Sequence, residues 1–110
     1  MSKREWRLYI EDILESIELI KSYIARMEFN DFKKDRKTID AVVRNFEVIG
    51  EATKFIPEEI KDSHPDIDWQ GIVGLRNRIA HEYFDVSPSI IWQIITGELL
   101  EFEERIKKVL

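Results

Sequence analysis

The feature that most constrains the fold is a run of apolar residues that recurs every three or four positions at the start of the chain. This spacing places the residues on one face of a helix, so it predicts a single amphipathic helix over roughly residues 3–28. A narrow apolar seam of this length is typical of helix bundles, in which each helix buries one stripe against its neighbours. The members of the seam are Trp6, Ile10, Ile13, Ile17, Ile20, Ile24 and Met27.

The same periodicity returns after a polar stretch. Residues 28–37 are mostly polar, which predicts a loop with room for one helical turn, and a second long helix is predicted over roughly residues 36–55. Gly50 lies inside this helix, where glycine weakens an exposed helix. Its presence therefore indicates a close contact with another helix, at a point where a side chain would not fit.

Proline and capping residues divide the chain after the second long helix. A short helix is predicted from Pro57 through Ile60, and Pro65 prevents it from continuing. The third main helix is predicted to begin after a cap formed by Asp66 or Asp68 and to end near residue 82. Its expected apolar face consists of Trp69, Ile72, Leu75 and Ile79.

The last helix is predicted to begin at Ser87 and Pro88, a cap followed by a favourable first residue, and to continue to the end of the chain. The chain is therefore predicted to be one all-α domain over residues 1–110, an up-and-down four-helix bundle with a short extra helix. Several apolar residues lie beside the seams, and a homodimer is predicted because it would bury them. These residues are Leu8, Leu14, Leu19, Ile90, Ile91, Ile94 and Leu100.

Composition excludes several classes of protein. The chain is 44% apolar and 35% charged, which suits a folded domain and argues against disorder. It has no cysteine, no apolar run near the ~20 residues of a membrane helix, and a charged start unlike a signal peptide, so a cytoplasmic location is expected. The net charge of -5 disfavours broad, nonspecific binding of nucleic acid but allows a local basic pocket.

The stretch GLRNRIAHEYFDVSP, residues 74–88, is the candidate site. On a helical wheel that starts at Arg76, Asn77 lies at about 100° and His81 at about 140°, away from the apolar face. Arg76 could bind a phosphate oxygen, His81 could transfer a proton, and Asn77 could orient His81 or donate to the phosphate. The same residues also suit the dipole at a helix C-terminus, so spacing alone leaves both interpretations open.

At these residues the sequence resembles a known family. LRNRIAHEYF matches the Arg-x4-His-x-Tyr signature of HepT-like proteins (the former DUF86 family), which belong to the HEPN superfamily. Residues 43–57, VRNFEVIGEATKFIP, resemble the second-helix block of that family, and residues 64–92 resemble its third-helix block and the start of its last helix. The resemblance covers nearly the whole chain and implies an HEPN bundle that dimerises with its motif helices facing each other.

The resemblance also implies a function. HepT-like proteins are toxins whose antitoxin partner is a minimal nucleotidyltransferase, and many HEPN proteins are ribonucleases that need no metal or other cofactor. On this basis Arg76 is the expected phosphate ligand, His81 the acid–base residue and Asn77 a polar residue inside the motif. Tyr83 matches the tyrosine that the partner modifies with AMP. The expected substrate is RNA, such as tRNA or mRNA.

The second long helix contributes three further candidates. Arg44, Glu47 and Glu51 fall within about 60° of one another and form one polar strip. The strip is either a solvated or internally paired face, or it places Glu47 or Glu51 where they orient Arg76 or His81.

Two other functions stay open on the sequence alone. The pocket could bind a nucleotide or the partner, so that the chain is a non-enzymatic module regulating the nucleotidyltransferase; the acidic net charge favours this, since an RNA-cutting enzyme gains from a basic surface. The chain could also be a purely structural helical dimer. His64, the second of two histidines, is expected to be an ordinary loop residue, and no metal site is expected.

Overall fold

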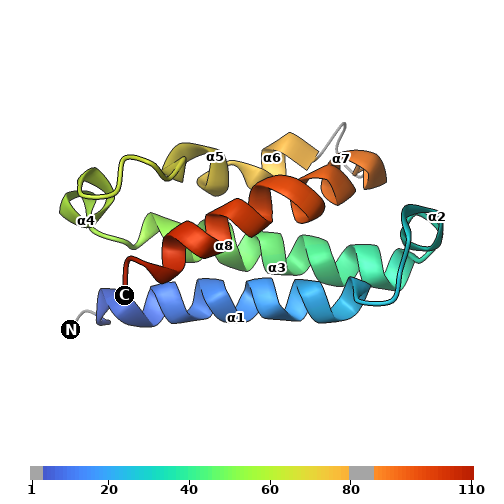
Figure 1. Cartoon of the computed structure of the whole chain (residues 1–110), viewed down its shortest axis with the longest axis horizontal. Helices are drawn as coiled ribbons and strands as arrows, with labels where there is room; N and C mark the ends of the chain where they lie inside the picture. Colours follow the sequence, from blue (N-terminus) through green and yellow to red (C-terminus); the bar gives the residue numbers. More distant parts are fainter. Residues whose placement is uncertain (1–3, 80–85) are drawn as a thin grey trace.

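The predicted N-terminal seam forms a long helix, α1 (Trp6–Ile24), in the computed structural model, which describes residues 4–79 and 86–110 (Figure 1). Its four central isoleucines, Ile10, Ile13, Ile17 and Ile20, are fully buried. The second long helix, α3 (Arg36–Lys54), runs back alongside α1 and buries its own seam, which includes Val42, Phe46 and Ile49. The predicted pair of amphipathic helices is confirmed.

The polar stretch between these helices contains the single helical turn for which the sequence left room. This turn is α2 (Phe29–Phe32), and Phe32 is fully buried. Asp35 then caps α3, because its carboxylate accepts a hydrogen bond from the Thr38 backbone N–H at 3.1 Å. That hydrogen bond, together with one from the Thr38 hydroxyl, lowers the pKa of Asp35.

The short predicted helix is α4 (Glu58–Asp62); Pro57 is its N-cap rather than part of its first turn, and the helix continues two residues past Ile60. The third predicted helix is divided into α5 (Trp69–Val73) and α6 (Leu75–Ile79), because the backbone at Gly74 turns out of the α-helical conformation. Asp68, one of the two expected caps, accepts a hydrogen bond from the Gly71 N–H at 3.0 Å. The predicted continuation of this helix to about residue 82 lies outside the described residues.

The last helix has a feature that the sequence did not predict. It begins as α7 (Pro88–Gln93), capped by the Ser87 hydroxyl as predicted, and ends as α8 (Leu99–Lys107). Between them lies a wider π-helical turn, η1 (Ile94–Glu98). An additional residue in one turn shifts the phase of the residues that follow, so Ile94, Ile95 and Leu99 all reach the core.

One part of the argument for a dimer is corrected by this arrangement. Ile91 on α7 and Ile94 in η1 are buried by the chain itself, and they need no partner chain. Leu8, Leu19 and Leu100 are exposed and are the residues that a second copy would still cover. The homodimer therefore stays a prediction.

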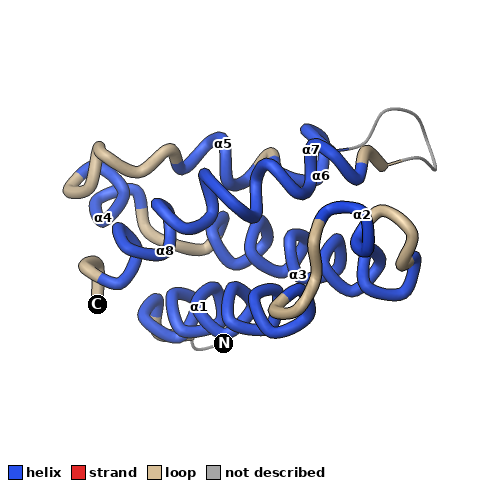
Figure 2. Tube along the Cα trace, turned by 45° about the vertical axis from the view of Figure 1, so that its right-hand side comes forward, coloured by secondary structure: helices blue, strands red, loops and turns tan. Residues whose placement is uncertain are grey.

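The described helices form an all-α bundle in which α3 lies between α1 and the α5–α6 pair (Figures 1 and 2). The C-terminal helix α8 packs against α1. Within the ranges that the structure describes, no helix is long and apolar enough to cross a lipid bilayer.

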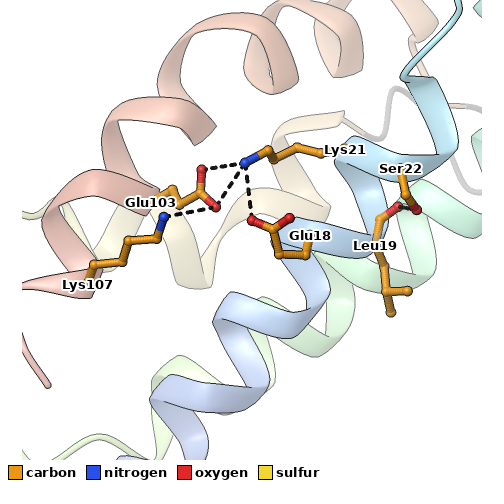
Figure 3. A network of polar contacts seen from close by, with 6 residues as sticks. All are labelled: Glu18, Leu19, Lys21, Ser22, Glu103 and Lys107. Carbon is orange, nitrogen blue, oxygen red and sulfur yellow. Dashed lines mark hydrogen bonds and ion pairs between the residues drawn. The ribbon is translucent and has the colours of Figure 1, made fainter.

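A buried carboxylate joins the last helix to the first (Figure 3). Glu103 on α8 has a side chain only 7% exposed, and it accepts hydrogen bonds from the Lys21 ammonium on α1 at 3.0 and 3.2 Å. Lys21 also binds Glu18 at 3.2 Å, and the Lys107 ammonium lies 3.9 Å from Glu103. The hydrogen bond to Glu103 is the main cause that raises the pKa of Lys21, followed by the one to Glu18.

Replacing Lys21 with methionine tests this link. Lys21→Met should lower the free energy of unfolding at neutral pH by about 1–3 kcal/mol, because Glu103 keeps a buried charge but loses its closest donor. Because the pair raises the pKa of Lys21, its contribution to stability is present below the ordinary lysine pKa and is lost as the pH rises past the raised value, so the deficit should shrink at strongly alkaline pH. Urea unfolding at several pH values measures both effects.

The double variant Lys21→Met, Glu103→Leu is the control, because it removes both charges and should recover most of the lost stability. A Lys21→Met variant that is as stable as the unmodified protein at neutral pH would show that the pair does not hold α8 to α1.

Candidate functional site

The candidate motif is presented by the short helix α6. Leu75 and Ile79 on this helix are fully buried, as the apolar spacing predicted, and Asn77 is exposed. The side chain of Arg76 and the whole of His81 and Tyr83 lie outside the described part of the chain. The structure therefore places the beginning of the motif and the surface next to it.

Gly50 brings α3 against this part of the chain. A Cβ atom at Gly50 would lie 3.2 Å from the backbone oxygen of Val73 and 3.6 Å from that of Ile72. This distance confirms the prediction of a close contact at Gly50, because a side chain there would press on the end of α5. The backbone of α3 thus lies directly beside the start of the motif helix.

A groove of about 590 Å³ runs along this contact. It collects four of the predicted site residues from two helices, Arg44, Glu47 and Glu51 from α3 and Asn77 from α6. The polar strip of α3 therefore faces the motif helix. The prediction that Glu47 or Glu51 orients Arg76 or His81 stays a prediction. Aromatic and charged residues complete the lining, including Tyr9, Asp12, Lys54 and Phe55.

The charges in the groove are not equivalent. The Glu51 carboxylate accepts a hydrogen bond from Lys54 at 3.0 Å, and Asp12 is bound by Arg4 at 2.6 Å. Glu47 is half-buried and is not a free carboxylate. Arg44 is exposed, and no hydrogen bond or ion pair joins it to another residue of the ranges 4–79 and 86–110. The groove can therefore offer a guanidinium group to an anion.

A further polar contact fixes the motif helix to the last helix. Arg78 donates two hydrogen bonds to Glu98, at 2.6 and 2.8 Å, and this carboxylate raises the pKa of Arg78. Glu98 is the last residue of η1, so the π-helical turn sets its position. The sequence shows both residues but gives no signal that they meet, because their pairing depends on the unpredicted turn.

Neither the second groove of the described chain nor His64 belongs to the groove beside the motif helix. A second groove, of about 780 Å³, is lined by α4, α5 and their connector, and it contains none of the predicted site residues. His64 lies in that connector, as expected of a loop residue, and its backbone oxygen accepts a hydrogen bond from the Trp69 indole at 3.1 Å. Among the described residues there is no group of three or more histidine, aspartate or glutamate side chains that could hold a metal ion.

Comparison with known proteins identifies the family. The profile of the family described as "Ribonuclease HepT-like" matches residues 13–109, which span the bundle and the motif. The chain belongs to the ribonuclease HepT-like family. This result confirms the resemblance seen in the LRNRIAHEYF stretch, and no solved structure matches this HepT-like chain significantly.

Two curated relatives are similar to this HepT-like chain over almost their whole length. The "Probable ribonuclease HepT" of Thermococcus cleftensis is 37% identical over 97% of this chain and 97% of its own. A protein of Methanocaldococcus jannaschii named "Putative RNase MJ0127" is 39% identical over 99% of this chain and 93% of its own.

Proposed function

We propose that this HepT-like protein is a metal-independent endoribonuclease that acts on RNA such as tRNA or mRNA. Membership of the family and the names of its relatives support a ribonuclease-like function. The observation that carries the proposal is the groove that is lined both by Asn77 of the motif helix and by Arg44 on the polar strip of α3. This arrangement offers cationic and amide donors beside the motif, as binding of a phosphodiester requires.

The proposed chemistry uses the motif residues without metal. Arg76 binds a non-bridging oxygen of the scissile phosphate and stabilises the charge that grows there in the transition state. His81 transfers a proton to or from a ribose hydroxyl or the leaving oxygen, because its imidazole titrates near neutral pH. Asn77 orients His81 or donates to the phosphate, and Glu47 or Glu51 orients one of the two catalytic side chains.

Acid–base cleavage uses one group to remove a proton and another to supply one. Each chain has one histidine in the motif, so we propose that the active form is a homodimer in which the two motif helices face each other. The exposed Leu8, Leu19 and Leu100 are apolar surface that a second copy could cover. A dimer of this kind supplies two copies of His81 to one site.

We further propose that the protein is the toxin of a toxin–antitoxin pair and that a minimal nucleotidyltransferase neutralises it. In this step the Tyr83 phenolic oxygen bonds to the α-phosphorus of ATP and pyrophosphate leaves. The resulting AMP group is bulky and negatively charged. Near Arg76 it would occupy the phosphate position and neutralise the guanidinium, so RNA could no longer bind.

Replacing His81 tests the proposed cleavage. The purified protein should cut RNA with EDTA present, and His81→Ala should reduce the rate at least about 100-fold, because proton transfer is lost. Gel analysis of labelled RNA gives the rates.

His64→Ala is the matched control, since it removes the other histidine of the chain and should leave the rate unchanged. Undiminished cleavage by a folded His81→Ala variant would contradict the proposed mechanism.

Intact mass tests the proposed modification. Protein co-expressed with a minimal nucleotidyltransferase should gain the mass of one or more AMP groups and should lose RNA cleavage. Tyr83→Phe should gain no such mass, whereas Tyr23→Phe, which alters an exposed tyrosine on α1, should gain it as the unmodified protein does. AMP on the Tyr83→Phe variant would place the acceptor elsewhere.

A second function is that of a regulatory module which binds a nucleotide or the nucleotidyltransferase. It is favoured by the net charge of -5, because an RNA-cutting enzyme gains from a basic surface. Titration of the protein with RNA and with ATP separates the two functions. Binding of ATP without turnover of RNA would support the regulatory module and contradict the ribonuclease.

A further inference from the structure

An exposed aromatic pair stands at one end of the groove. The rings of Tyr9 on α1 and Phe55, the residue that follows α3, are stacked with centroids 5.1 Å apart and planes inclined by 15°. Both residues line the groove. The pair forms because the start of α1 lies beside the end of α3 (Figure 1).

The ring of Phe55 is the accessible member of this pair. Phe55 is 60% exposed, the largest exposure among the large apolar residues of the described chain, whereas Tyr9 is half-buried. The guanidinium of Arg4 also lies over the Tyr9 ring, 4.7 Å from its centroid. Tyr9 is therefore engaged by two neighbours, and Phe55 presents an aromatic surface that the chain itself leaves open.

Phe55 continues the polar strip of α3. At 100° per residue it lies within about 20° of Arg44 around the helix axis, and a rise of 1.5 Å per residue places it about 16 Å further along. Arg44 has no partner among the described residues, and the groove connects the two side chains. A positive group and an open aromatic face thus line one groove about 16 Å apart, with Glu47 and Glu51 between them along the helix.

We infer that this groove binds single-stranded RNA, with a base stacked on Phe55 and a backbone phosphate held by Arg44. Proteins bind single strands in this way, combining cations along the backbone with aromatic rings under the bases. The separation of about 16 Å exceeds what a base and its own phosphate span, so it favours an oligonucleotide over a single nucleotide. The inference rests on the proposed action on RNA and adds a base-binding subsite beside the motif.

The charge pattern favours RNA over a protein partner at this surface. The acidic residues Asp12 and Glu51 are paired with Arg4 and Lys54, and Glu47 also has a partner, so Arg44 is the charged group of the described lining that is left to bind an anion.

Binding of a short single-stranded RNA with 2′-O-methyl riboses tests the subsite apart from cleavage, because the capped hydroxyls cannot take part in it. Fluorescence anisotropy gives the dissociation constant. Phe55→Leu should raise it about tenfold, because leucine keeps the apolar volume but cannot stack. Tyr23→Leu is the matched control: it removes another exposed aromatic ring, on α1 and outside the groove lining, and should leave the constant unchanged.

An abasic nucleotide distinguishes stacking from a general change in structure. Replacing the stacked nucleotide with an abasic one should weaken binding to the unmodified protein about tenfold and should have no further effect on Phe55→Leu. Three results would each overturn the subsite. They are additive losses from the abasic nucleotide and Phe55→Leu, equal binding by Phe55→Leu and Tyr23→Leu, and no binding of the probe by the unmodified protein. Free AMP that binds as tightly as the RNA, and depends on Phe55, would overturn the oligonucleotide track in favour of a mononucleotide site.

The remaining outcome concerns binding of a protein, either the nucleotidyltransferase or a second copy of the chain. If Phe55→Leu binds RNA normally but no longer binds the nucleotidyltransferase or a second copy, the aromatic pair is a protein contact and the inference fails. Failure of the proposed function gives a different result. The unmodified protein would then leave ordinary RNA uncut, but it would still bind the 2′-O-methyl RNA, and this binding would still depend on Phe55.

Discussion

The close contact between α3 and the end of α5 at Gly50 is the constraint on which the candidate site depends. A side chain at this position would press on the backbone oxygen of Val73, 3.2 Å from the added Cβ, so the end of α5 would have to shift by a few tenths of an ångström. With glycine, the two helices approach closely enough for one groove to include side chains of both. The core explains how the bundle folds, and this contact brings the polar strip of α3 beside the start of the motif helix.

The distribution of charge reconciles an acidic protein with an anionic substrate. The net charge of -5 argues against a nucleic-acid-coating protein, yet the groove needs only a cation that can bind a phosphate, and Arg44 has no ion-pair partner among the described residues. Pairing of Glu51 with Lys54 neutralises one carboxylate close to Arg44. Affinity of this kind is sensitive to salt and limited to a few phosphates, which suits an enzyme that must select its RNA rather than bind any RNA.

Most of the fold could be predicted from the sequence because it depends on local rules: apolar spacing for the helices, Asp68 and Ser87 for caps, and Gly50 for a close contact. The break at Gly74, the π-helical turn and the Arg78–Glu98 pair were not predicted, because they follow from how the last helix packs across the third. The grouping of Arg44, Glu47 and Glu51 was predicted, but their common groove with Asn77 needed the tertiary structure. Phe55 was not singled out, since an aromatic residue after a helix is ordinarily part of the core.

The most direct test of the central claim, that the groove between α3 and the motif helix is the RNA-binding surface, is a nuclear magnetic resonance titration. Isotope-labelled protein is mixed with increasing amounts of a single-stranded RNA that cannot be cleaved, and the shifts of the backbone amides are followed. The groove predicts that the largest shifts occur at Arg44, Glu47, Glu51, Phe55 and Asn77. Shifts concentrated in the second groove, along α4 and α5, with these five residues unaffected, would contradict the account.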